Sequence, residues 1–255
     1  MRGAGLDGEA RQGAARPEPP AWRREITTIS FDMDGTLVDF AAAMRSALAW
    51  VLAEIHRAVP ETPEWLTVPA LMAIRDGMTE AHPQERHDVT RRMAIAHALE
   101  LIGHPDPDLV TYLTEGYRVR RLAATYLYPD TQETLVALGR RYTLGITSNG
   151  NSDPRHYGLG PHFSFVVFSE DHGVSKPDPR LFAIALREAH CHSHECLHVG
   201  DLAWADVAGA QAAGLRAAWL RRGDAPSETP PADLPPPDLT IDRLTELVDL
   251  LCPDA

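Results

Sequence analysis

The chain has 255 residues, of which 44% are hydrophobic, so it can bury the core of one large domain or of a domain with a sizeable insertion. Lys and Arg number 24 against 36 Asp and Glu, which gives a formal net charge of -12. An acidic surface repels nucleic acid and anionic membranes, so we expect neither as a partner. No segment has the roughly 20 consecutive apolar residues that a membrane helix needs.

The segment before residue 25 is rich in Gly, Ala, Arg and Pro and lacks the apolar stretch of a secretory signal. We therefore predict a disordered leader over 1–24. The three cysteines, Cys191, Cys196 and Cys252, are too few for a disulfide scaffold. These features together favour a reduced, cytoplasmic setting.

The ordered chain begins with a β-branched run at 26–31, a predicted strand that ends at the acidic, glycine-containing sequence DMDGT at 32–36. Apolar residues then recur at intervals of three and four, and no strand pattern interrupts them. This periodicity predicts helices at 41–57, 83–102 and 108–124. We therefore expect an all-helical insertion over 40–126.

Strands and helices alternate after residue 129. Such alternation predicts an α/β fold, in which a mostly parallel, Rossmann-like sheet carries helices on both faces. This core takes 25–39 and 127–255, and the proline-rich stretch 226–237 is expected to be a surface linker. The predicted strands are 143–147, 163–168, 196–200 and 215–220, and the predicted helices begin at 130 or 131 and then span 180–189, 205–213 and 241–251.

Polar segments follow several of these strands. In an open α/β sheet a ligand binds at the carboxyl ends of the strands, where strand order reverses. Asp, Asn, Gly and Ser are also common in ordinary turns, which is the alternative interpretation. Several such segments in this order nevertheless favour a site, and they contribute Asp32, Asp34, Ser148, Asn149, Lys176 and Asp201.

The motifs DMDGTL at 32–37, ITSNG at 146–150, SKPD at 175–178 and GD at 200–201, with Asp206 five residues on, resemble the four motifs of the haloacid dehalogenase superfamily. The helical insertion resembles the C1 cap of its phosphatase-rich first subfamily. The likeness extends over about 27–220, and the ordered set is specific where one motif alone is weak. It implies a phosphoric monoester hydrolase that uses Mg²⁺ and acts on a small phosphorylated metabolite.

Carried over by position, the resemblance implies that Asp32 is the nucleophile, which forms an aspartyl-phosphate, and that Asp34 is the general acid and base. It further implies that Ser148 and the amide of Asn149 bind the transferring phosphoryl group, while Lys176 neutralises its charge.

The metal site is implied in the same way. The resemblance gives Mg²⁺ the carboxylates of Asp32 and Asp201 and the backbone carbonyl of Asp34. Asp206 is expected to hold Lys176 or a metal-bound water from outside the ligand set, and Thr36 to tie down the loop.

The same chemistry is reasonable without the family. A phosphate ester is anionic and repels an anionic nucleophile, so a divalent cation is needed between them. Mg²⁺ prefers oxygen ligands, which suits aspartates with no His or Cys. Asp32 and Asp34 are two residues apart, so in extended backbone their side chains share a face and reach one substrate. Acid–base help from Asp34 is typically worth ~10²–10⁴-fold in rate.

Three alternatives stay open at this point. A phosphomutase would pass the same aspartyl-phosphate to another hydroxyl group. A dehalogenase of the same fold needs no Mg²⁺ and usually lacks the second aspartate, so Asp34 argues against it. A non-catalytic binding protein is disfavoured because each motif residue is present. The sequence does not identify the substrate, and a monomer or a homodimer fits equally.

Two further groups of side chains are assigned no role. Ligands of the type that zinc prefers are dense between His190 and Cys196, but their spacing matches no common zinc finger, so we expect an incidental His-rich loop. Charged residues of the predicted cap helices are expected to be solvated, and these are Arg75, Asp76, Arg118, Arg120 and Arg121.

Overall fold

The structure is a computed structural model that describes residues 19–82, 85–222 and 235–253. Residues 1–18 of the predicted leader lie outside the described ranges. The last residues of the predicted leader form a 3-10 helix, η1 (Ala21–Arg24). Most of the predicted linker, 226–234, also lies outside the described ranges. No helix in the described ranges has the length and apolarity to cross a membrane.

The core is a six-stranded parallel sheet, as the alternation of strands and helices predicts, with strand order β3-β2-β1-β4-β5-β6. Chain order reverses on either side of β1, which places a topological switch point between β1 and β4. The strands are β1 (Thr28–Phe31), β2 (Thr143–Ser148), β3 (Phe165–Phe168), β4 (Cys196–Gly200), β5 (Arg216–Leu220) and β6 (Leu239–Ile241).

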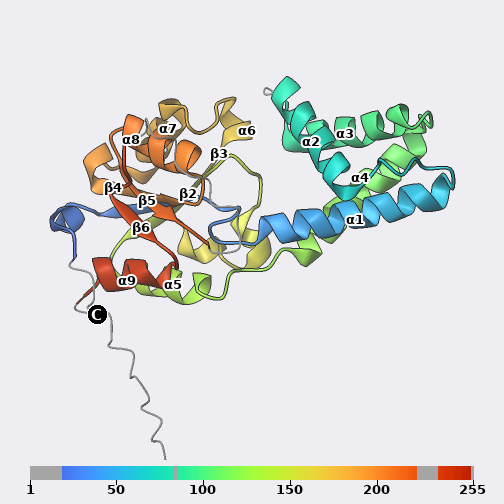
Figure 1. Cartoon of the computed structure of the whole chain (residues 1–255). Helices are drawn as coiled ribbons and strands as arrows, with labels where there is room; N and C mark the ends of the chain where they lie inside the picture. The colour runs from blue at the N-terminus through green and yellow to red at the C-terminus, as the bar shows by residue number, and fades with distance from the viewer. Residues whose placement is uncertain (1–18, 83–84, 223–234, 254–255) are drawn as a thin grey trace, which may run out of the picture.

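Helices cover both faces of the sheet, which confirms the predicted layering (Figure 1). One face carries α5 (Thr131–Leu138) and α9 (Thr245–Leu251). The other carries α7 (Pro179–Ala189) and, after the π-helix η5 (Ala203–Ala208), α8 (Gly209–Ala212). The remaining short helices of the core are η2 (Pro154–Tyr157), η3 (Gly160–His162), α6 (Ser169–His172) and η4 (Ser193–Glu195).

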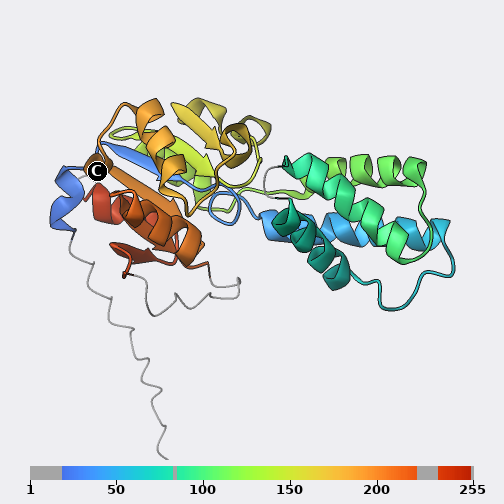
Figure 2. The same cartoon turned by 90° about the horizontal axis from the view of Figure 1, so that it is seen from above.

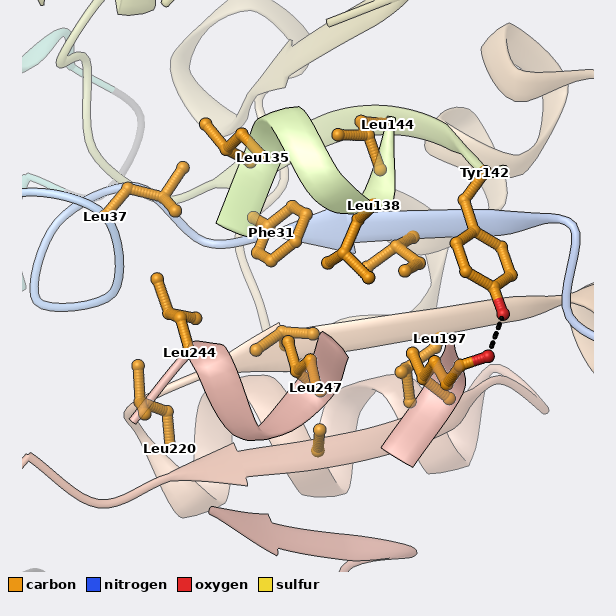
Figure 3. Packing of buried hydrophobic residues seen from close by; sticks show 14 of the residues in the cluster. Phe31, Leu37, Leu135, Leu138, Tyr142, Leu144, Leu197, Leu220, Leu244 and Leu247 are labelled. Carbon is orange, nitrogen blue, oxygen red and sulfur yellow. Dashed lines mark hydrogen bonds between the residues drawn. The ribbon is translucent and has the colours of Figure 1, made fainter. Parts of the chain in front are cut away.

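The main core lies between the sheet and the α5–α9 pair (Figure 3). Phe31 of β1 packs there with Leu138 of α5 and Leu247 of α9, and all three side chains are fully buried. Burying each such side chain contributes about 1.5–3 kcal/mol. Tyr142 closes the end of this core, where its hydroxyl donates to the carbonyl of Leu251 over 3.0 Å.

Three predicted elements differ from the structure. The predicted helix 83–102 begins only at His87, and positions 83–84 lie outside the described residues. The predicted helix 241–251 is shorter, because Ile241 ends strand β6 and the helix begins at Thr245. Three residues are too few for a strand pattern to emerge beside a proline-rich segment. The predicted helix 205–213 begins at Ala203 and contains the π-helical turns of η5, which a 3.6-residue period does not describe.

The predicted helical cap is inserted between β1 and β2 and has four helices (Figures 1 and 2). One of them, α2, was not predicted, because Leu71 is its one buried residue and it contains Gly77, a residue that disfavours helix. Its start is nevertheless well defined, since the Thr67 side chain accepts from the Ala70 amide at 3.3 Å. The helices are α1 (Phe40–Ala58), α2 (Val68–Ala81), α3 (His87–Leu101) and α4 (Pro107–Ala124).

Two segments connect the cap to the core, and they run antiparallel beside each other. The amide of Asp39 donates to the carbonyl of Tyr126 over 2.9 Å, and Val38 forms an antiparallel bridge with Leu127. The cap has its own apolar core, which includes Leu99 and Leu113. A separately packed cap on a two-stranded tether lies beyond the carboxyl end of β1, where the candidate site is expected (Figure 2).

Candidate active site

The loop after β1 carries Asp32 and Asp34, and a glycine brings it against the loop after β4. Gly35 has φ +87°, a backbone conformation that favours glycine. A Cβ atom on Gly35 would lie 2.4 Å from a carboxylate oxygen of Asp201, so a larger residue would force that carboxylate to move. Thr36 is fully buried and donates to the same carboxylate over 3.2 Å. The predicted first and fourth motifs therefore meet.

The loop after β2 meets the same place. Ser148 is the last residue of β2 and is buried, and its hydroxyl accepts from the amide of Gly150 at 3.2 Å. A Cβ atom on Gly150 would lie 2.2 Å from the Asp34 carboxylate. The Asn149 side chain fixes the backbone of Lys176. Its Oδ1 accepts from the Lys176 amide over 2.7 Å, and its Nδ2 donates to the Lys176 carbonyl over 2.9 Å.

Lys176 is the only lysine of the sequence; every other residue of the Lys and Arg total is arginine. Its side chain is 2% exposed, and its ammonium group donates to Asp32 Oδ1 and to Asp206 Oδ1, both over 2.6 Å. Burial alone would lower the pKa of Lys176, but Asp206 and Asp32 together raise it above its usual value. Lys176 is therefore a fixed positive charge beside the predicted nucleophile.

Asp206 holds the Lys176 side chain in place. Its Oδ1 accepts from Lys176 and lies 3.2 Å from His198 Nε2, and its Oδ2 accepts from the Leu202 amide over 2.9 Å. Burial would raise the pKa of Asp206, but Lys176 and His198 outweigh that effect and hold it well below its usual range. With both oxygens engaged, Asp206 has the geometry expected of a residue that positions Lys176.

His198 is a site residue that the sequence reasoning missed. It lies in β4, fully buried, with Nδ1 3.2 Å from the Ser30 hydroxyl, which is 2.8 Å from the Thr147 hydroxyl. A hydrogen-bonded chain therefore runs beneath the site, from Lys176 through Asp206 and His198 to two neighbouring strands. The available signal was an ionisable residue in the middle of a predicted core strand, 196–200.

Three carboxylates meet at the centre of the site. Oxygens of Asp32, Asp201 and Asp206 all lie within 4.8 Å of one another, and this is the one group of metal-ligand type found among the described residues. Burial raises the pKa of Asp32, and burial together with the charges of Asp32 and Asp206 raises that of Asp201 well above its usual value. Buried oxygen donors that repel one another in this way suit a hard divalent cation.

Asp34 differs from these three. Burial raises its pKa to about 6, although a hydrogen bond from Ser152 acts in the opposite direction. Its Oδ1 has no hydrogen-bond partner among the described residues. At neutral pH this carboxyl group is therefore within reach of both protonation states, which suits proton transfer.

The cap contributes one unexpected residue to this neighbourhood. Arg121 was expected to be a solvated surface charge, and that expectation is wrong, because its side chain is buried at the junction of cap and core. It lies 3.5 Å from the Ser152 hydroxyl and its charge acts on Asp34. Arg118, one turn earlier on α4, is solvated as expected, with its side chain 51% exposed and paired with Glu115.

Comparisons with known proteins agree with this geometry. The sequence model of the haloacid dehalogenase-like hydrolases matches residues 26–214. The 5-amino-6-(5-phospho-D-ribitylamino)uracil phosphatase YigB of Escherichia coli K12 is 30% identical over 190 residues, which are 69% of this chain and 75% of that protein.

Two solved structures share the fold over most of the chain. A 2-haloacid dehalogenase from Pseudomonas syringae is 34% identical, with a TM-score of 0.69, over 90% of this chain and 100% of the other. The HAD-hydrolase YfnB of Bacillus subtilis, bound to magnesium, is 25% identical, with a TM-score of 0.69, over 89% of this chain and 99% of the other. The chain therefore belongs to the haloacid dehalogenase-like hydrolase family.

Proposed function

We propose that the chain is a Mg²⁺-dependent phosphatase that hydrolyses a small phosphorylated metabolite through an aspartyl-phosphate on Asp32. One observation carries the proposal: Asp32, Lys176 and Asp201 come from three separate segments and converge at one point, with the lysine ammonium 2.6 Å from the Asp32 carboxylate. The relative from Escherichia coli is a phosphatase, and the structure from Bacillus subtilis holds magnesium, which supports both parts of the proposal.

The residues at the site fit the metal. The carboxylates of Asp32 and Asp201 and the backbone carbonyl of Asp34 would hold Mg²⁺, whereas Asp206 is occupied by Lys176, His198 and a backbone amide. When bound, Mg²⁺ supplies positive charge that offsets the repulsion between an anionic nucleophile and an anionic ester.

The protein groups then divide the reaction into two steps. In the first, an oxygen of Asp32 attacks phosphorus, the ester P–O bond breaks, and protonated Asp34 gives its proton to the leaving alkoxide. In the second, a water attacks the phosphorus of the aspartyl-phosphate while Asp34 takes the proton of that water. Phosphate leaves and Asp32 is regenerated. Lys176 balances the charge on the phosphoryl oxygens throughout, and Ser148 orients them.

The cap has a second part in the proposal. It is tethered through the paired segments at Val38–Leu127 and at Asp39–Tyr126, so it can close on the substrate without unfolding either core. Closure excludes water during the first step, when hydrolysis by solvent would compete with attack by Asp32.

The test is release of phosphate from p-nitrophenyl phosphate, with and without Mg²⁺. We expect activity that requires Mg²⁺ and is lost in Asp32→Asn, and trapping of label on Asp32 when a slow substrate is quenched in acid. Full activity of Asp32→Asn contradicts the mechanism. Isomerisation of a sugar phosphate without free phosphate assigns the same site to a phosphomutase instead.

A dehalogenase is the second candidate, because the solved structure from Pseudomonas syringae is one. That reaction displaces a halide from carbon. A halide leaves without protonation, so the reaction does not need Asp34 as a general acid. We expect no chloride release from 2-chloropropionate. Chloride release without Mg²⁺, together with no phosphatase activity, would reverse the assignment.

A further inference from the structure

The start of α3 contacts the core through α6, a short helix at the edge of the core that faces the cap (Figure 1). The first amides of a helix usually bond the side chain of the residue just before it, but here that residue, Arg86, makes no such bond. Glu170 of α6 supplies the acceptor instead. Its Oε2 accepts from the amide of His87 over 3.1 Å, and its Oε1 accepts from Arg86 over 2.8 Å. A carboxylate of the core therefore completes a helix of the cap.

The side chain of His87 makes a second contact with the core, in the loop after β2. Its Nε2 lies 2.6 Å from the carbonyl oxygen of Asn149, and because a carbonyl can only accept, Nε2 carries the proton and donates the hydrogen bond. The Ser169 hydroxyl donates to the same carbonyl over 3.1 Å. Both lone pairs of this oxygen are thus engaged, one by the core and one by the cap.

The Asn149 peptide is connected to several groups of the candidate site. Ser148 precedes it, and Gly150, which follows it, donates its amide to the Ser148 hydroxyl over 3.2 Å. The Asn149 side chain holds the Lys176 backbone through two hydrogen bonds. A displacement of this peptide would therefore move Ser148 and Lys176 together, and a shift of about 1 Å in a catalytic group can lower a rate about 10²-fold.

Polar contacts, with little apolar packing, hold the cap to the core at this point. A pocket of about 110 Å³ lies beside the contact, between the α2–α3 end of the cap and the segment from α6 to Ser175. Val174 is the one hydrophobic residue among the described residues that line it. Separation of the cap here would expose little apolar surface, so a few hydrogen bonds decide whether α3 is docked.

We propose that His87 and Glu170 are positioning residues of the phosphate-binding loop. When α3 docks on α6, they fix the Asn149 carbonyl, and through it they set the positions of Ser148 and Lys176. This inference rests on the proposed function. The Nε2 of His87 and both oxygens of Glu170 are already occupied, so neither residue needs to touch the substrate. The effect is on the phosphoryl group that all substrates share, and not on the leaving group that distinguishes them.

Binding of inorganic phosphate in the presence of Mg²⁺ isolates this effect, because phosphate has no leaving group. Titration calorimetry gives its Kd for the unmodified enzyme and for His87→Ala, which lacks the donor. We expect His87→Ala to raise this Kd roughly two- to tenfold, the range for loss of one hydrogen bond. His87→Gln should restore most of the affinity, because its terminal amide can donate from a similar position. An unchanged Kd in His87→Ala overturns the inference, as does a lack of phosphate binding to the unmodified enzyme.

His97→Ala is the matched control, because His97 lies on the same helix but has a side chain that is 40% exposed and pairs with Glu100 of that helix. It should bind phosphate as the unmodified enzyme does. An equal loss in His97→Ala would mean that any disturbance of α3 weakens binding. No recovery in His87→Gln would mean that the hydrogen bond is not the cause. Either result contradicts the inference.

Two substrates with different leaving groups separate positioning from contact with the substrate. In His87→Ala, kcat/KM for p-nitrophenyl phosphate and for glycerol 2-phosphate should fall by the same factor. Unequal factors would show that His87 contacts the leaving group instead, which contradicts the inference. Failure of the proposed function is a different result: the unmodified enzyme would then release phosphate from neither substrate, while the effect of His87→Ala on the Kd of phosphate could still be measured.

A double variant tests whether the two residues act through one docked contact. Glu170→Ala should lower kcat/KM for both substrates equally, as His87→Ala does. Because residues that share a contact are not additive, the double variant His87→Ala/Glu170→Ala should lose about as much as the larger single loss. Losses that multiply in the double variant would contradict a shared contact.

Discussion

Replacing Lys176 with Met tests whether this lysine holds the centre of the site together. The substitution keeps most of the apolar stem but removes the ammonium group, so Asp32 and Asp206 each lose a 2.6 Å partner. Removing one partner of a buried ion pair typically costs about 3–5 kcal/mol. In a chain of this size each kcal/mol corresponds to a few degrees, so we expect a fall in Tm of roughly 10 °C.

The measurement is calorimetric unfolding at pH 7.5 without Mg²⁺. Neighbouring acids raise the pKa of Lys176, so its stabilisation is fully present below the ordinary value of 10.5 and is lost only as pH rises through the folded value. The whole effect is therefore visible at pH 7.5. Arg180→Met is the control, because Arg180 is 77% exposed in its pair with Asp178 and should contribute less than about 1 kcal/mol. A Lys176→Met protein that melts within a degree of the original refutes the reasoning.

Three further predictions follow from single contacts. Gly35→Ala should abolish phosphatase activity, because its Cβ would lie 2.4 Å from the Asp201 carboxylate; normal kcat would contradict the packing of the two loops. Tyr142→Phe should lower the free energy of unfolding in urea by about 1 kcal/mol through loss of the bond to Leu251, and no change would show that the bond is not stabilising. A hydrogen bond from Cys196 lowers the pKa of Cys191 to about 7, so alkylation of Cys191 should slow as pH falls through 7. A midpoint near 9 would contradict that shift.

The parts of the fold that the sequence predicted are those with strong local patterns. β-branched runs that end in polar loops identified five of the six strands, and the motif order predicted that Asp32, Lys176 and Asp201 would converge. Helix α2 and strand β6 escaped detection for a common reason. Each depends on neighbours elsewhere in the chain more than on its own periodicity, and α2 buries one residue along its length.

The site shows the same division. The residues that follow strands could be identified because the edge of a parallel sheet collects them. His198 and Arg121 could not, since their importance depends on which distant groups surround them: Ser30 and Asp206 for the histidine, Ser152 and Asp34 for the arginine. A charge on a cap helix is usually solvated, and only the packing of the cap on the core shows that Arg121 is not.

The single lysine has a practical consequence for anyone who works with this protein. Because its side chain is 2% exposed, amine-directed reagents should not modify Lys176 while the site is folded. Modification of Lys176 then reports unfolding of the site itself. A sample labelled with ¹⁵N-lysine would likewise give one side-chain NMR signal, and that signal would come from the ammonium group that pairs with Asp32 and Asp206.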